Sequence, residues 1–292
     1  MRLATIRHQG KETAAIVSAD GLITLEELNR ATDSVWSTDL LTLITSGQFA
    51  ALKSWYHHGG GAKLQQQTVT WIPLDADYAP PYRRPRKIWG IGLNYVEHAR
   101  DLSETAPSAE PASFMKPDTA IIGPGETIRV PLQSERTTGE AELGIVIGQR
   151  CKDVPQDQAY RVVAGFVPII DITAEDILQR NPRNLTLSKS FDSFFSFGPH
   201  LVTPDEIEDP LSLQVATYLN GQLHRRNVVA NMTFRPDFLI AFHSRVMTLL
   251  PGDIISTGTP GAVVISDGDL VEARIDGFPT LANPVRDLKL AG

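Results

Sequence analysis

Two carboxylates, Glu140 and Glu142, open the apolar stretch EAELGIVIG at residues 140–148. If this stretch is a β-strand, its side chains alternate between two faces, so both acids point the same way. A solvated strand edge tolerates such a pair and stays soluble because of it. Alternatively, a hard divalent cation such as Mg²⁺ or Mn²⁺ binds between the carboxylates and removes their repulsion. The metal interpretation requires a third acid.

Asp171 supplies that acid, at the end of the apolar run VVAGFVPIID at residues 162–171. The pattern predicts a buried strand with a carboxylate at its tip. An isolated buried charge costs several kcal/mol, so a metal is a natural partner. A strand-ending or helix-capping aspartate is the alternative. Taken together with the glutamate pair, Asp171 favours a metal site.

A histidine and an acid lie three residues apart in GIGLNYVEHARDL, residues 90–102, which is typical of a strand end leading into a helix. His98 and Asp101 then share one helix face, where the acid can orient the imidazole or share its proton. An ordinary surface pair is the alternative. The polar, proline-containing residues 103–113 that follow are typical of a mobile lid.

Lys189 lies in the aromatic segment TLSKSFDSFFSFGP, residues 186–199. A buried lysine requires an anion, either the acidic cluster or an anionic substrate. A lysine whose ammonium reaches solvent is the alternative. In STGTPG, residues 256–261, glycines allow close backbone approach and hydroxyls could hold a carboxylate, although such turns are common.

The elements that must position these groups divide into two regions. Residues 1–80 read as a small α+β domain, with strands near 2–7 and 13–19, a turn at Asp20-Gly21 and a helix over 40–56. The proline-rich segment 79–86 is typical of a linker, which places the second domain at residues 81–292.

The second domain reads as mostly β. Asn220-Gly221 predicts a hairpin, and turns follow at 251–253 and 276–277. One helix is expected over 235–250, with Pro236 in its first turn. The fold class is therefore α+β, mostly β.

Composition excludes several classes of protein. A net charge of -7 over 292 residues argues against a nucleic-acid surface. A single cysteine excludes internal disulfides and cysteine-rich zinc sites. The apolar runs are too short to span a membrane and no signal peptide is evident, so we expect a cytoplasmic location and no membrane partner.

Several of these segments occur in an order that resembles the fumarylacetoacetate hydrolase family, over roughly residues 85–285. The motifs are GIGLNYVEHA, SFMKP, GEAELGIVIG, IIDITAED, LSKSFDSFFSFGP, NGQ and LLPGDIISTGTPG. The resemblance implies a mixed β-sheet roll, bound Mg²⁺ or Mn²⁺ with Ca²⁺ as a further option, and a homodimer. Residues 1–80 resemble the small leading domain of two-domain bacterial members.

The resemblance also assigns roles to residues of this chain. It implies metal binding by the acidic cluster, a water-activating dyad, a lysine beside the substrate and several substrate contacts. The metal ligands are Glu140, Glu142 and Asp171; the dyad is His98 and Asp101; the lysine is Lys189; and the contacts are Tyr95, Lys116 and Thr259.

The leading functional hypothesis is hydrolysis of a C–C bond in a β-diketo acid through a metal-stabilised enolate. In that reaction the histidine would deprotonate the attacking water. Decarboxylation, isomerisation or hydration of a related oxo acid on the same site stays open, and so does a metal-binding protein without turnover.

One segment departs from the family pattern. After the metal aspartate the family commonly reads A-R-D-x-Q, whereas this chain has Glu175 and Leu178 in place of the arginine and glutamine. The exchange predicts a less cationic and more apolar pocket, suited to an oxo acid with a single anionic end. Alternatively, Glu175 turns outward to another ion pair.

Overall fold

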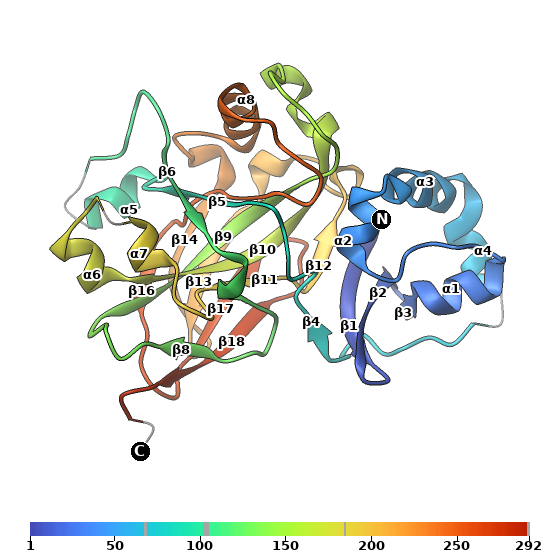
Figure 1. The fold of residues 1–292 in the computed structure, drawn as a ribbon, viewed down its shortest axis with the longest axis horizontal. Helices are drawn as coiled ribbons and strands as arrows, with labels where there is room; N and C mark the ends of the chain where they lie inside the picture. Colours follow the sequence, from blue (N-terminus) through green and yellow to red (C-terminus); the bar gives the residue numbers. More distant parts are fainter. Residues whose placement is uncertain (67–68, 102–104, 184, 291–292) are drawn as a thin grey trace.

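The computed structural model describes residues 1–66, 69–101, 105–183 and 185–290. The N-terminal region contains four strands and four helices within these limits (Figure 1). They are β1 Arg2–His8, β2 Lys11–Ser18, β3 Gly21–Thr24, α1 Leu25–Thr32, α2 Leu40–Thr45, α3 Gln48–Trp55, α4 Gly61–Gln66 and β4 Tyr78–Ala79. The two strands predicted near residues 2–7 and 13–19 are present.

The single helix predicted over residues 40–56 is wrong, because the segment forms two helices, α2 and α3. Gly47 separates them with a left-handed backbone, φ 81°. Glycine adopts this left-handed conformation without steric cost. A residue in this conformation cannot continue a right-handed helix. The apolar spacing of the two short helices therefore imitates one longer helix.

The N-terminal strands continue into the main sheet of the molecule. β1 pairs antiparallel with β12, His200–Val202, and the Met1 carbonyl accepts a hydrogen bond from the Thr203 hydroxyl at 2.8 Å. In Figure 1, β1 accordingly lies between the N-terminal helices and the larger part of the molecule. This pairing crosses the boundary expected at residue 80, and the division into domains 1–80 and 81–292 stays a prediction.

The larger region is mostly β, as the sequence predicted. Its helices are α5 Val96–Asp101, α6 Glu175–Arg180, α7 Leu185–Lys189 and α8 Pro236–Val246. Its other strands are β5 Ile88–Gly92, β6 Ala112–Lys116, β7 Ile121–Ile122, β8 Ile128–Val130, β9 Thr137–Ile147, β10 Val163–Ala174, β11 Phe195–Phe197, β13 Gln214–Leu219, β14 Gln222–Val228, β15 Ile254–Ser256, β16 Ala262–Val264, β17 Leu270–Ile275 and β18 Leu281–Asp287.

In the described residues these strands form a 13-stranded and a 5-stranded sheet, both largely antiparallel. The main path of the first is β3-β2-β1-β12-β10-β9-β15-β5-β6, and the second is β14-β13-β17-β18-β8. β13 and β17 of the small sheet pack against β9 of the large one. The hydrophobic core between them covers both long strands, so the fold is a mixed roll of class α+β.

The local turn predictions are confirmed. Asn220 and Gly221 connect β13 to β14 with positive φ at both positions, 52° and 76°, as a tight hairpin turn requires. Pro236 begins α8 as predicted, but the helix ends at Val246 and not at residue 250. Leu249 instead exchanges two backbone hydrogen bonds with Cys151, both 3.0 Å.

The central pair of the large sheet is β9 and β10. Every residue of both strands is buried, and they run antiparallel from Thr137↔Ala174 to Val163↔Ile147. The prediction that Asp171 lies at a strand tip is wrong, because β10 continues for three residues beyond it. Those residues pair with the first three residues of β9, so the partner strand sets the length.

The α-helices of the described residues are five to eleven residues long. None of the helices there combines the length and the apolar character that crossing a bilayer requires. The cytoplasmic location expected from the sequence stays a prediction.

Candidate metal centre and active site

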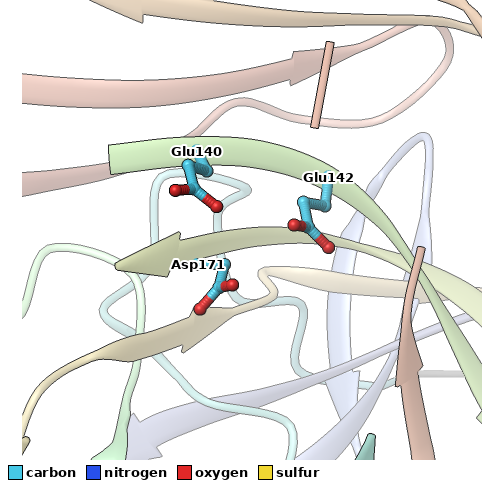
Figure 2. A group of neighbouring side chains, drawn as sticks. All are labelled: Glu140, Glu142 and Asp171. Atoms are coloured by element: carbon cyan, nitrogen blue, oxygen red, sulfur yellow. The ribbon is translucent and has the colours of Figure 1, made fainter. Parts of the chain in front are cut away.

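Three carboxylates converge on one face of the central strand pair, as Figure 2 shows. Glu140 and Glu142 point the same way from β9, and Asp171 of β10 is the direct register partner of Glu140. Each contributes an oxygen within 4.8 Å of the others, and their residues are 7%, 1% and 0% exposed. The two strands thus bring together the three acids that the sequence singled out.

Two buried lysines neutralise part of this charge. Nζ of Lys189, the last residue of α7, lies 2.9 Å from Glu140 Oε2 and 2.5 Å from Asp171 Oδ2. Nζ of Lys116 on β6 donates to Asp171 Oδ1 and, at 3.1 Å, to the Ile172 carbonyl. The anion that the buried Lys189 requires is therefore the acidic cluster itself.

The ion pairs shift the pKa values of the partners. Burial disfavours ionisation of Asp171, but the ammonium groups of Lys116 and Lys189 outweigh it and hold its pKa below the ordinary value. Burial lowers the pKa of Lys116 to about 8, despite the attraction of Asp171. Lys189 faces several carboxylates, which overcome its burial and raise its pKa. Asp171 is thus the fixed anion of the cluster.

Glu142 behaves differently, since neither lysine bonds to it among the described contacts. Burial raises its pKa, and the neighbouring Asp171 charge acts in the same direction. Its Oε2 accepts hydrogen bonds from the Ser256 hydroxyl and, at 2.8 Å, from the Gly258 amide. The 256–261 segment therefore holds a carboxylate of the protein itself, and Gly258 reaches it with a φ of 96°.

Two threonines that the sequence analysis did not identify complete the cluster. The Thr173 and Thr138 hydroxyls donate to Glu140 Oε1 at 2.7 and 3.3 Å. Both could have been found from strand periodicity, because Thr138 lies two residues before Glu140 and Thr173 two residues after Asp171. Hydroxyl donors restrict the orientation of the carboxylate and leave its charge in place.

This donor set fits a hard divalent cation. Carboxylate oxygens are the ligands that Mg²⁺ and Mn²⁺ prefer. The cluster carries three carboxylates against two ammonium groups, so one negative charge is unmatched when all are ionised. Glu142 is the carboxylate to which neither lysine bonds among the described contacts. Glu140, Glu142 and Asp171 are therefore the residues that would hold the ion.

Two of the three acids open onto a cavity of about 270 Å³. Glu140, Glu142 and Lys189 line one part of it, together with Thr138, Thr173 and Thr259. Its apolar wall consists of Ile91, Leu93, Ala112, Leu178, Pro182, Leu185 and Ala262. The cavity thus combines a charged part beside these acids with an apolar wall.

The structure brings most of the predicted site residues to this cavity. His98 on α5 lines it and is 6% exposed, and Thr259, Glu175 and Leu178 line it as well. Thr259 Oγ1 donates to the Gly261 carbonyl at 3.1 Å. The catalytic and substrate-binding roles of these four residues stay predictions.

Two predicted substrate contacts lie elsewhere. Lys116 is bonded to Asp171 and is not among the described residues that line the cavity. Tyr95 is fully buried, and no hydrogen-bond partner for its hydroxyl occurs in the described part of the chain. Burial raises the pKa of Tyr95, with a contribution from the Glu142 charge. Substrate contact by Lys116 and Tyr95 is thus a prediction that the cavity lining does not support.

Asp101 is the last residue of α5, and its side chain lies outside the described part of the structure. The dyad with His98 therefore stays a prediction. The lid predicted over residues 103–113 also falls partly outside the described residues, and its last two residues belong to β6.

Glu175 lies in the cavity wall and also forms an ion pair. Its Oε2 is 2.9 Å from Arg136 Nε, and its Oε1 accepts a hydrogen bond from Gln179 Nε2 at 2.9 Å. The residue is 8% exposed. Arg136 was not identified from the sequence, because it lies 39 residues from Glu175. Gln179 was also missed, although its position four residues after Glu175 is typical of a side-chain contact on a helix.

Comparison with known proteins connects this geometry to a family. The family described as "Fumarylacetoacetate (FAA) hydrolase C-terminal" matches residues 87–286 of this chain. An oxaloacetate tautomerase of Xenopus laevis mitochondria, fahd2, is 37% identical over 214 residues, which span 70% of this chain and 67% of that protein.

Solved structures resemble the whole chain. Maleylpyruvate hydrolase from Sphingobium sp. SYK-6, in complex with manganese(II) and pyruvate, superposes with a TM-score of 0.78 at 27% identity. The match covers 98% of this chain and 99% of that one. A 5-carboxymethyl-2-hydroxymuconate delta-isomerase from Mycobacterium smegmatis gives a TM-score of 0.75 at 30% identity, over 98% and 99% of the two chains.

These similarities cover the strands that carry the acids and the elements that surround the cavity. The family includes hydrolases, isomerases and tautomerases, one of them solved with a divalent ion. The buried Glu-Glu-Asp cluster indicates a divalent metal site here as well. The chain is a member of the fumarylacetoacetate hydrolase family.

Proposed function

We propose that this chain is a Mg²⁺- or Mn²⁺-dependent hydrolase that cleaves a C–C bond in a β-diketo acid. The observation that carries the proposal is that a buried histidine, His98, lines the same cavity as the acidic cluster. Hydrolysis requires an activated water beside a polarised carbonyl group. In this cavity His98 would activate the water, and the acidic cluster would hold the metal ion that polarises the carbonyl group.

The acidic cluster would hold the metal ion through Glu140, Glu142 and Asp171. When bound, the ion would act as a Lewis acid that stabilises negative charge on the oxygen of a 2-oxo acid. Lys189 lies on the same cavity wall and bonds to Glu140 and Asp171. Its positive charge would favour an anionic substrate once a bound metal ion neutralises these carboxylates. The Thr259 hydroxyl also lines the wall and would turn from the Gly261 carbonyl, which it meets at 3.1 Å, to the substrate's carboxylate.

His98 would accept a proton from the attacking water. The hydroxide adds to the distal carbonyl carbon, the bond between that carbon and the central carbon breaks, and the central carbon then takes up a proton. The products are a carboxylic acid and a 2-oxo acid. Asp101 would orient the imidazole as a positioning residue.

A second candidate is tautomerisation of an oxo acid such as oxaloacetate, which the relative from Xenopus laevis supports. That reaction moves a proton between carbon and oxygen of the substrate and consumes no water. His98 would then serve as the proton carrier, with the same acids and lysine beside it. The two candidates therefore differ in products and not in the residues that they require.

Product identity separates them. Purified protein with Mn²⁺ should be incubated with acylpyruvates, oxaloacetate and 2-hydroxydienoates, and the products identified by mass spectrometry and NMR. Hydrolysis predicts that an acylpyruvate yields two acids, with one oxygen from labelled water in the new carboxylate. Enol–keto exchange of oxaloacetate without cleavage of any acylpyruvate would contradict the leading proposal and support the second.

The proposal includes a homodimer, which the resemblance to the family implies. Light scattering coupled to size-exclusion chromatography measures the mass directly. A mass near twice the 32.0 kDa of one chain is the expected result, and a monomer that remains active would contradict it.

A further inference from the structure

The cavity wall contains a further carboxylate, Glu175, which is not part of the acidic cluster. Side chains alternate along β10, so Asp171 and Thr173 share one face, and Glu175 follows as the first residue of α6. Thr173 and Glu175 both line the cavity. Glu175 directly follows the last residue of β10, four residues beyond Asp171 in the sequence. The cavity thus has a metal-binding part and, beyond the end of β10, a part beside Glu175.

The position of Glu175 is fixed from two sides. Arg136 bonds to Oε2, and the Glu175 amide donates to the Arg136 carbonyl at 2.8 Å. Gln179, one turn further along α6, donates to Oε1. Both carboxylate oxygens are therefore held, so the carboxylate stays in the wall when a ligand enters.

Among the described residues that line the cavity, no lysine or arginine is left to pair with a second anionic group. Lys189 lines it, but its ammonium already bonds to Glu140 and Asp171. Arg136 is engaged by Glu175, and half of its side chain is exposed. The other wall residues that lie close to Glu175 in the sequence are apolar: Leu178, Pro182 and Leu185.

We infer that Glu175 is a specificity-determining residue that rejects substrates with a second carboxylate and selects monocarboxylic oxo acids with an uncharged, apolar far end. This inference rests on the proposed function and specifies its substrate class. A second carboxylate would meet Glu175 without a free cation, and like charges at close range are strongly unfavourable. An alkyl or cyclic end would instead contact leucine and proline.

The test compares a β-diketo acid that ends in a methyl group with the dicarboxylate of the same chain length. We expect wild-type kcat/KM to favour the monocarboxylate by at least about tenfold. Glu175→Gln removes the charge and keeps one of the two accepting oxygens that Arg136 and Gln179 use, so it should reduce this ratio by about tenfold.

Arg136→Gln gives a second, opposite expectation. It removes the cation that partly neutralises Glu175, so the preference for the monocarboxylate should increase by about two- to fivefold. Glu135→Gln is the matched control, since Glu135 is exposed, lies beside Arg136 and carries the same charge. Its ratio should equal that of the wild type. A ratio that Glu175→Gln leaves unchanged would overturn the inference.

Binding provides a measurement that does not depend on turnover. Calorimetry of the Mn²⁺-loaded wild type with 2-oxohexanoate and 2-oxoadipate should show tighter binding of the monocarboxylate, and Glu175→Gln should narrow the difference. Equal affinities would overturn the inference and leave the proposed function standing. If neither acid binds, the proposed function fails, and the inference fails with it.

Discussion

Replacing Glu142 by glutamine should stabilise the metal-free protein and abolish its response to metal. The amide oxygen can still accept the hydrogen bonds from Ser256 and Gly258, so the local geometry is kept. The change removes a buried charge whose ligand oxygen lies within 4.8 Å of those of two other carboxylates.

The magnitude follows from that distance. Two like charges 4.8 Å apart repel by about 3 kcal/mol at an effective dielectric constant of about 20. Lys189 offsets part of this repulsion and protonation relieves more, so we expect a net gain of about 1–3 kcal/mol, or a few degrees in Tm. For a carboxyl group with a raised folded-state pKa, the stability it contributes is complete below its ordinary pKa of 4.5 and is lost as pH rises towards about 8. The advantage of the glutamine variant should therefore grow across that interval.

Thermal denaturation with and without Mn²⁺ measures both effects. At a metal concentration of about 100 times Kd the wild type should gain about 2.7 kcal/mol, and Glu142→Gln should gain almost nothing, so the order of stability reverses. Glu272→Gln is the control, because Glu272 is a buried glutamate on β17, paired with Arg274 at 3.0 Å and outside the cavity lining. It should respond to metal as the wild type does. Equal metal gain in Glu142→Gln would refute its role as a ligand, and a metal-free Tm several degrees below the wild type would refute the charge argument.

Three further predictions concern other buried groups. Lys189→Met should destabilise the metal-free protein by about 3 kcal/mol, because Glu140 and Asp171 lose a buried cation, and saturating Mn²⁺ should restore much of the loss in a melting assay. His98→Asn should lower kcat for hydrolysis by about 10²–10⁴-fold while the heat of Mn²⁺ binding is unchanged; a loss of metal binding would contradict its placement outside the ligand set. Burial lowers the pKa of His243 to about 4, so its contribution to stability is complete above about pH 6.5 and is lost as pH falls towards 4; His243→Phe should remove up to about 2 kcal/mol of this acid sensitivity in urea titrations at pH 5 and pH 7.

The parts of the fold that the sequence predicted are those with local causes. The Asn220-Gly221 turn needs two positive φ angles, and the start of α8 needs only the fixed φ of Pro236. The same holds for the orientation of Glu140 and Glu142, which depends on strand alternation alone. Each of these features is decided within a few residues.

The errors have non-local causes. α8 stops at Val246 because Leu249 pairs with Cys151, nearly a hundred positions earlier in the chain. β10 continues beyond Asp171 because its next three residues pair with the first three residues of β9. Arg136 meets Glu175 only because the β9–β10 register brings Thr137 opposite Ala174. Pairing between distant segments is not encoded in local periodicity, so no single-sequence pattern could have shown these contacts.

The arrangement of the cavity separates the acidic cluster from the groups that we propose act on the substrate or select it. The three acids lie on β9 and β10, which are buried along their whole length and paired on both sides, so their spacing is set by the sheet register. His98, Glu175 and Leu178 instead lie on helices of six residues each, α5 and α6. Short helices owe their geometry to a few contacts, as the Arg136 and Gln179 bonds to Glu175 illustrate. Substitutions on these helices can therefore change the accepted substrate, or the reaction, without disturbing the ligand set. This separation gives a physical reason why hydrolases, isomerases and tautomerases can share one fold while the residues of their cavity walls differ.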